Sequence, residues 1–319
     1  MNSFLSKFLQ IALPLGLGVF LIWYSYSKFT PQQLEEITFY FRKADYGYII
    51  LAVTFSIWSH ISRAYRYNFM LAPMGYQPSL ANNFMAISVA YLMNMFIPKS
   101  GEVSRGIVLQ KYEDIPFEKG FGAIISERVI DLIFLLAFTV LALSLQFDVL
   151  YGFLTELISP IKLLLTVLIL IILGAIVLFA IYRSQSAIAR RLKKFLKGLK
   201  EGIFSIATME KKNAFLFHTF VIWGLYLLSF YTATFALEET SFISAGTLII
   251  TFVVGSFSFA FTNSGFGVYP FFVAGILALL GVAETVGTAF GWIVWTSNIA
   301  SIVILGGLSF LILPFYNRK

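Results

Sequence analysis

The chain has 319 residues, of which 59% are hydrophobic and only 12% are charged, and its mean hydropathy is +0.84. Soluble domains carry about 25% charged residues, so this composition excludes a soluble globular protein and a disordered chain, and the absence of Cys excludes a disulfide scaffold. The apolar runs are long and continuous, which excludes a transmembrane β-barrel. They predict an all-α polytopic membrane protein with about eight transmembrane helices, counting broken or re-entrant hairpins.

The predicted spans follow one another along the chain. Residues 8–24 lack a small-residue cleavage site, so we interpret them as an uncleaved first span rather than a signal peptide. Two later segments are interrupted, residues 80–112 around Pro98 and residues 245–282 around Ser264. The other predicted spans are about 46–62, 129–147, 161–182, 214–236 and 287–313.

Basic residues set the predicted orientation. Residues 183–213 hold nine Lys and Arg, whereas the short loops near Asp148 and Glu238 hold none. The positive-inside rule therefore predicts a multi-pass protein of the plasma (inner) membrane with both termini in the cytoplasm. Residues 184–204 alternate apolar and basic positions at helical spacing and predict an amphipathic helix on the cytoplasmic surface. One loop, residues 28–45, disagrees because it is predicted outside yet carries Lys28, Arg42 and Lys43.

The two interruptions suggest internal symmetry. They lie 164 residues apart, at Ser100-Gly101 and Ser264-Gly265, and the orientation makes them enter from opposite faces. Paired broken segments of this kind predict an inverted repeat within a single integral membrane domain, residues 1–319, with halves of about 1–182 and 214–313. The alternative is chance, because Gly and Pro are common in membrane helices.

Charged residues gather at the first interruption and shortly after it. Glu102 and Arg105 share one helical face, as do Glu127 and Asp131. Charges inside a bilayer are costly, so we expect them to line a polar pocket in which Arg105 or Arg128 binds a lipid phosphate. The alternative is an ion-pair network that only joins two helices, or charges at headgroup level. The predicted substrate-binding residues are Asn94, Glu102, Arg105, Glu127, Arg128, Asp131, Asn263 and Ser264, and the predicted helix-break residues are Pro98, Gly101, Gly265, Gly267 and Pro270.

This polar pattern resembles that of a flippase-like integral membrane family related to the transmembrane region of lysylphosphatidylglycerol synthases. The family's Asn, Pro, Gly-Glu-x-x-Arg and Glu-Arg-x-x-Asp motifs are matched in order by the residues from Asn94 to Asp131. A second motif, roughly Pro-x-Pro-Gly-Gly-x-Gly-Val-x-Glu, is matched only in part, because Asn263 replaces a proline and Pro270 stands in the place of the Glu. The resemblance implies handling of a lipid or lipid carrier. It does not imply lysyl transfer, since the family's transferase is a separate soluble domain and this chain ends at Lys319.

Three functions remain open at this point. The first is a flippase-like transporter of a phospholipid or a polyprenyl-phosphate-linked lipid, which is not an enzyme and needs no cofactor, metal or nucleic acid. The second is a lipid-phosphate enzyme similar to undecaprenyl-pyrophosphate phosphatases, although the expected Glu-x-x-x-Glu is missing and only Glu127 and Asp131 have comparable spacing. The third is a non-catalytic membrane partner of a glycosyltransferase or lipid synthase that docks on residues 183–213.

Overall fold

A computed structural model of the chain describes residues 3–97, 99–149 and 209–318, with scattered positions between 151 and 193. Within these residues the regular structure is entirely helical, which confirms an all-α membrane protein. The chain divides into two compact units, unit 1 (Met1–Ile125 with Glu210–Lys319) and unit 2 (Ser126–Met209). Pro98, most of the predicted span 161–182 and most of the predicted helix 184–204 lie outside the described residues.

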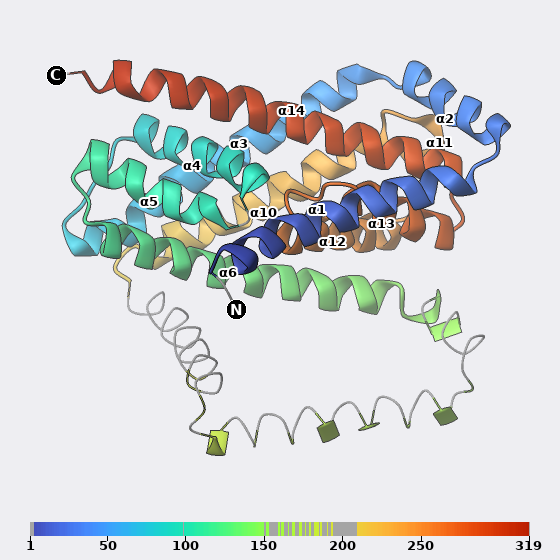
Figure 1. Ribbon diagram of the computed structural model, residues 1–319, viewed down its shortest axis with the longest axis horizontal. Helices are drawn as coiled ribbons and strands as arrows, with labels where there is room; N and C mark the ends of the chain where they lie inside the picture. Colours follow the sequence, from blue (N-terminus) through green and yellow to red (C-terminus); the bar gives the residue numbers. More distant parts are fainter. Residues whose placement is uncertain are drawn as a thin grey trace. The chain divides into compact units, whose positions relative to one another are not determined.

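The helices follow the order of the predicted spans (Figure 1). Among the described residues, α6, α10 and α14 are long and apolar enough to cross a membrane. The elements are α1 (Ser3–Lys28), α2 (Pro31–Lys43), α3 (Tyr46–Leu71), the 3-10 turn η1 (Ala72–Met74), α4 (Leu80–Phe96), α5 (Ser100–Glu113), α6 (Phe117–Leu145), α10 (Lys212–Thr234), α11 (Glu238–Ser241), α12 (Ala245–Phe261), α13 (Val268–Leu279) and α14 (Glu284–Tyr316).

Helix starts follow local capping chemistry. Thr30 forms a capping box with Gln33 ahead of α2, and the side chains of Ser79 and Ser244 accept hydrogen bonds from backbone N–H groups in the first turns of α4 and α12. Such caps satisfy donors that a helix N-terminus leaves without intrahelical partners. These three helices therefore have start signals in the local sequence.

Both interrupted segments form helical hairpins in unit 1. In the first hairpin α4 and α5 lie side by side, and in the second α12 and α13 do so. These helices have 17, 14, 17 and 12 residues, or about 26, 21, 26 and 18 Å at 1.5 Å per residue. Each is shorter than the roughly 30 Å of bilayer hydrocarbon. The interruptions at residues 97–100 (the first tip) and 262–267 (the second tip) therefore separate short helices.

The first hairpin packs along the C-terminal half of α14. Asn82, at the start of α4, exchanges two hydrogen bonds of 2.8 Å with Asn317, at the end of α14. Nearer the tip, a Cβ placed on Gly306 would lie 2.6 Å from the Cβ of Leu92. The two helices are therefore antiparallel, and the first tip points toward the middle of α14.

The second hairpin packs along the N-terminal half of the same helix. A Cβ on Gly287 would lie 3.2 Å from the Cα of Ala274, and the Trp295 Nε1 donates a hydrogen bond of 2.9 Å to the backbone oxygen of Ser264. The second tip thus also lies against the middle of α14. We extend the antiparallel packing of α4 on α14 from the Leu92 contact to the first tip, at about 1.5 Å per residue. The two tips then lie roughly 8 Å apart along the α14 axis.

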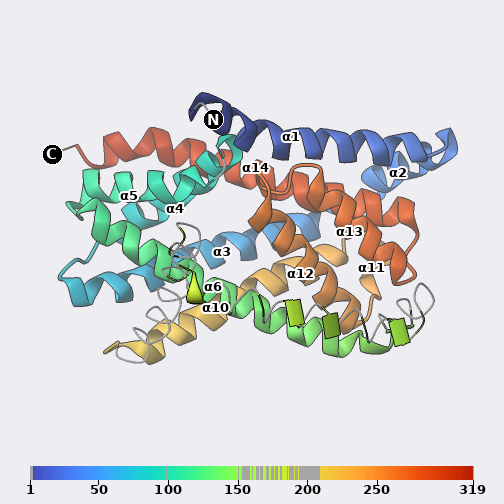
Figure 2. The ribbon, with the colours of Figure 1, turned by 60° about the horizontal axis from the view of Figure 1, so that its bottom comes forward.

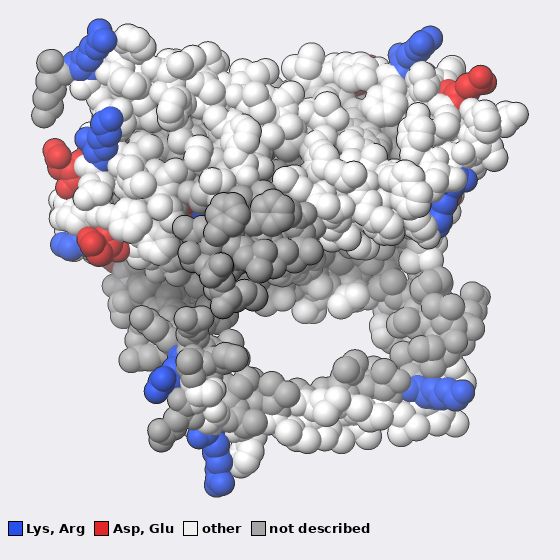
Figure 3. Space-filling model, in the orientation of Figure 1, with Lys and Arg blue, Asp and Glu red and all other residues white. Residues whose placement is uncertain are grey.

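Figure 2 shows this arrangement from another side, with α4 and α5 at the C-terminal end of α14 and α12 and α13 toward its other end. On the face drawn in Figure 3, the charged side chains of unit 1 gather at the two ends of its helices, and the surface between them carries almost none. An apolar band of this kind faces lipid in a membrane protein. The middle of α14, and with it both tips, lies at the level of this band.

Candidate functional site

The first tip is held by side chains from α4 and α5. Asn94 Oδ1 accepts a hydrogen bond of 2.7 Å from the Gly101 N–H, and Ser100 Oγ donates to the backbone oxygens of Met93 and Ile97 at 2.9 and 2.8 Å. Asn94 therefore caps the N-terminus of α5. A Cβ on Gly101 would collide with the Ala90 oxygen, so a glycine permits this close approach of the two helices.

The second tip is built from glycines and small polar residues. Gly265 and Gly267 have φ of +74° and +67°. A Cβ on Gly267 would collide with the backbone oxygen of Gly18, so α1 passes directly over this turn. Pro270 packs against Gly291, where a Cβ would lie 3.0 Å from the proline Cα. Glycines at these two crossings let α1, the second tip and α14 approach closely.

Each tip contains a residue with an unusual backbone. Among the described residues, three that are not glycine have positive φ, and two of them are Lys99 at the first tip (+60°) and Ser264 at the second (+52°). Left-handed backbone is disfavoured for residues with a Cβ and often marks functional positions. The two tips therefore share a feature beyond their matching positions along α14.

Asn263 is the one residue at the second tip whose polar side chain is both buried and unsatisfied by the described protein atoms. It is 4% exposed, and neither its amide nitrogen nor its amide oxygen has a hydrogen-bond partner there. A buried polar group left in this state costs about 1–3 kcal/mol. The amide is therefore available to a ligand atom or a water molecule.

Three arginines are buried in unit 1, and we call them the arginine cluster: Arg63, Arg66 and Arg105. They are 3%, 0% and 1% exposed. Arg63 and Arg66 lie one turn apart on α3, and the Arg105 guanidinium lies 4.0 Å from the centre of the ring of Tyr67, the next residue on α3. The contact between Arg105 and Tyr67 joins α5 to α3.

Neighbouring helices supply polar and aromatic partners to the cluster. Arg66 Nη1 donates to the hydroxyl of Thr219 on α10 at 3.0 Å, and Arg63 Nη2 donates to the hydroxyl of Tyr226 on the same helix at 3.4 Å. The Tyr67 hydroxyl in turn donates to the Gly120 oxygen at 2.6 Å. These contacts fix three guanidinium groups inside the bundle.

Arg105 was predicted to be a site residue, whereas Arg63 and Arg66 were not. The second predicted span ends at about residue 62, short of both arginines, whereas α3 continues to Leu71 with a buried face. The missed signal was the apolar and aromatic spacing beyond the charges, through Tyr67 and Leu71, which keeps one face of the helix apolar.

The second group of predicted charges belongs to unit 2, on α6. Glu127 is fully buried and Asp131 is 9% exposed, while Arg128 is partly exposed. Arg128 Nη1 lies 3.6 Å from Asp131 Oδ2, one turn further along the helix. In unit 1, Glu102 is partly buried on α5, one turn before Arg105. None of the predicted charges is fully exposed, and Arg105, Glu127 and Asp131 are the most buried.

Several of the predicted site residues meet one another within each unit. Asn94 and Gly101 meet at the first tip, Asn263, Ser264, Gly265 and Gly267 form the second tip, and Arg128 pairs with Asp131 on α6. Within the described residues, His, Asp and Glu do not form a group of three or more that could hold a metal ion.

Comparison with known proteins gives a consistent result. The family model described as the lysylphosphatidylglycerol synthase TM region matches residues 11–315. A UPF0104 membrane protein of Methanocaldococcus jannaschii is 29% identical over 100 residues, which cover 30% of this chain and 30% of that protein. No solved structure matches the chain. Because the family match spans nearly the whole sequence, the chain belongs to the family of the lysylphosphatidylglycerol synthase transmembrane region.

Proposed function

We propose that this membrane protein is a flippase-like transporter that moves a phospholipid or a polyprenyl-phosphate-linked lipid across the plasma membrane, with both termini in the cytoplasm. The observation that carries the proposal is the arginine cluster, three guanidinium groups buried within unit 1 of a membrane protein. The lipid itself is the partner that this function requires. Family membership and the paired hairpins support the same function.

The chemistry of the headgroup explains why such a cluster is useful. A lipid phosphate must cross a region where charge is poorly solvated, and planar guanidinium groups bind phosphate oxygens through paired hydrogen bonds. Apolar residues of similar volume would join the helices at lower cost. We therefore assign these buried guanidinium groups a role in anion binding.

The two hairpins supply a route for alternating access. Their tips lie against the middle of α14 from opposite ends of that helix, and this arrangement supports an inverted repeat. If each hairpin covers the path from one face, movement of one tip at a time opens the central region to one side only. The lipid tails can stay in the bilayer while the headgroup passes between the tips.

Transport of fluorescent phospholipid in reconstituted vesicles tests this function. We expect R105A to slow transport at least tenfold, whereas R105K, which keeps the charge without the planar fork, should retain an intermediate rate. Lys111, exposed on the same helix α5, provides the control, and K111A should leave the rate unchanged. Undiminished transport by folded R105A, judged by size-exclusion chromatography, would contradict the proposal.

A second variant tests the path without removing a charge. N263A deletes an amide that has no partner among the described protein atoms, so it should not destabilise the fold. If the amide binds the passing headgroup, N263A should transport more slowly while its melting temperature stays at or above that of the wild type. A wild-type transport rate would remove Asn263 from the path.

A further inference from the structure

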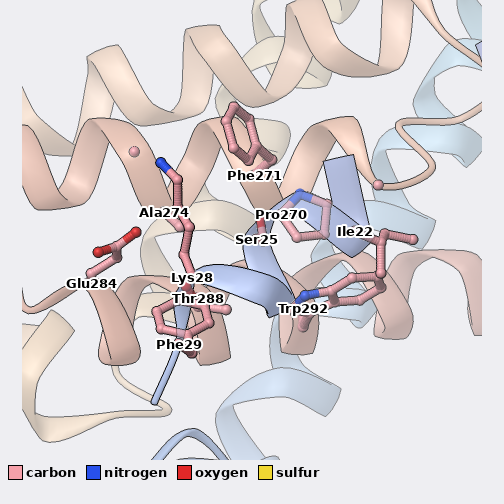
Figure 4. A pocket seen from close by; sticks show the side chains of 12 residues that line it. Ile22, Ser25, Lys28, Phe29, Pro270, Phe271, Ala274, Glu284, Thr288 and Trp292 are labelled. Atoms are coloured by element: carbon pink, nitrogen blue, oxygen red, sulfur yellow. The ribbon is translucent and has the colours of Figure 1, made fainter. Parts of the chain in front are cut away.

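A pocket of about 130 Å³ lies in unit 1 between the end of α1, the start of α13 and the first turns of α14 (Figure 4). On α14 its lining residues Glu284, Thr288 and Trp292 recur every fourth position, so they share one face of the helix. Ser25 and Lys28 of α1 face them across the pocket. None of these five residues belongs to the predicted site.

The charged end of this pocket reaches the surface. Lys28 and Glu284 are exposed, whereas Thr288 is 8% exposed and Pro270, also in the lining, is buried. Figure 4 shows the Lys28 ammonium and the Glu284 carboxylate at the same end of the pocket. The pocket therefore leads from a surface with both charges to a buried interior.

The two charges attract each other through space but are not in contact. The Lys28 ammonium lies 4.2 Å from the centre of the Tyr24 ring, and no ion pair joins it to Glu284 in the part of the chain that the structure describes. A ligand with one anionic and one cationic group suits this pocket mouth, because its anion can lie at Lys28 while its cation lies at Glu284. Lysine binds phosphate as a point charge, and a carboxylate accepts hydrogen bonds from an ammonium group.

The size of the pocket restricts the ligand to a small group. A cavity of about 150 Å³ holds benzene, so a volume of about 130 Å³ suits a fragment of similar size. Trp292 lines the end of the pocket away from Glu284. A lipid headgroup with one phosphate and one short amine has these dimensions and this chemistry.

We propose that the pocket binds a zwitterionic headgroup of the phosphoethanolamine type, with its phosphate at Lys28 and its ammonium group at Glu284. The inference rests on the proposed function and deepens it by naming the class of headgroup. Gly267 of the second tip also lines the pocket. Trp295, which donates a hydrogen bond to the Ser264 backbone oxygen, is three residues beyond Trp292 on α14. A headgroup bound in this pocket therefore lies beside the second tip.

Binding to the full-length protein in phosphatidylglycerol nanodiscs tests this inference, because those lipids carry no ammonium group. Isothermal titration compares O-phosphoethanolamine with glycerol phosphate. We expect the wild type to bind O-phosphoethanolamine about tenfold more tightly, the effect of one additional charged hydrogen bond. E284A should abolish that preference, and K28A should weaken both ligands.

An uncharged substitution separates the pocket from general surface charge. A Cβ on Gly275, which lines the pocket, meets nothing within 4 Å, so G275L should fill the space without a clash. We expect G275L to weaken O-phosphoethanolamine binding at least tenfold. Gly224, exposed on α10 and equally unobstructed, provides the matched control, and G224L should bind as the wild type does.

Dihexanoyl-phosphatidylethanolamine distinguishes a lipid from a free headgroup. Tighter binding of this short-chain lipid than of O-phosphoethanolamine would assign the pocket to a lipid, and equal binding would assign it to the free zwitterion. The alternative account is that Lys28 and Glu284 only complement the dipoles of the helix ends at which they lie. Wild-type affinity and preference in E284A and G275L would support that account and overturn the inference. Because this assay needs no transport, its failure is distinct from normal transport by R105A, which would contradict the proposed function.

Discussion

Gly306 and Gly307 are adjacent on α14 but have opposite surroundings, and this contrast allows a sharp test of how the first hairpin is held. A Cβ at Gly306 would lie 2.6 Å from the Cβ of Leu92 and 2.8 Å from the Ser88 backbone oxygen, whereas a Cβ at Gly307 meets nothing within 4 Å. The close atoms belong to the α4 backbone or lie next to it. The hairpin must therefore shift to admit a methyl group at position 306.

The expected magnitude combines two terms. Replacement of Gly by Ala inside a helix gains up to about 1 kcal/mol at either position. At Gly306 the extra methyl group adds an overpacking cost of about 1–3 kcal/mol. We therefore expect G307A to be as stable as the wild type or slightly more stable, and G306A to be less stable than G307A by about 1–3 kcal/mol.

Thermal melting of the two variants in the same detergent measures this difference. G306A should melt at the lower temperature, and its transport rate should change because displacement of α4 moves the first tip. Equal melting temperatures would refute the close approach of α4 to α14, and with it the inferred position of the first tip beside the middle of α14.

Three further outcomes are expected. N82A removes hydrogen bonds to Glu113 and Asn317 and should lower the free energy of unfolding by about 1–3 kcal/mol, measured by thermal melting. S264G relieves a left-handed residue and should be at least as stable as the wild type, so a lower melting temperature would contradict the strain. A hydrogen bond from the Lys43 ammonium to the Glu239 carboxylate raises the pKa of Lys43 above its usual 10.5. The stability that this pairing adds is present below the usual pKa and is lost as pH rises through the raised value, so the melting difference between K43A and the wild type should stay constant from about pH 6 to pH 9.

The two hairpins could be predicted because their causes are local. Gly101 and the neighbouring charges interrupt an apolar run, and Ser264-Gly265 does the same in the second half. A helix needs continuous hydrogen bonding inside a bilayer, so a break of this kind is visible in the sequence itself. The packing of both hairpins on α14 is not visible there, since it depends on pairs such as Asn82 and Asn317 that are 235 residues apart.

The arginines of α3 were missed for a related reason. A predicted span ends where charges begin, whereas Arg66 is accommodated by Thr219, 153 residues away in the sequence. Hydropathy along one segment contains no information about such a partner. Lys43, in the one loop that disagreed with the positive-inside rule, likewise has distant partners, because it pairs with Glu238 and Glu239 at 3.7 and 3.2 Å.

The roles within the candidate site could be predicted only in part. Asn94 was expected to bind substrate, but its Oδ1 caps the Gly101 N–H, whereas the Asn263 amide remains available. Sequence cannot separate these two asparagines, since both lie beside a helix break. The pocket between Lys28 and Glu284 was not foreseen, because residues 256 positions apart come together only through packing of α1 against α13 and of α13 against α14.

The 33 residues of α14 have a mechanical consequence. Such a helix is about 50 Å long, well beyond the roughly 30 Å of hydrocarbon, so it must tilt or extend past the bilayer. Each hairpin abuts a different half of it, one on either side of the centre. If α14 tilts about its centre, the two hairpins move in opposite directions. In the proposed transporter, the two hairpins would then not open the path to both sides of the membrane at the same time.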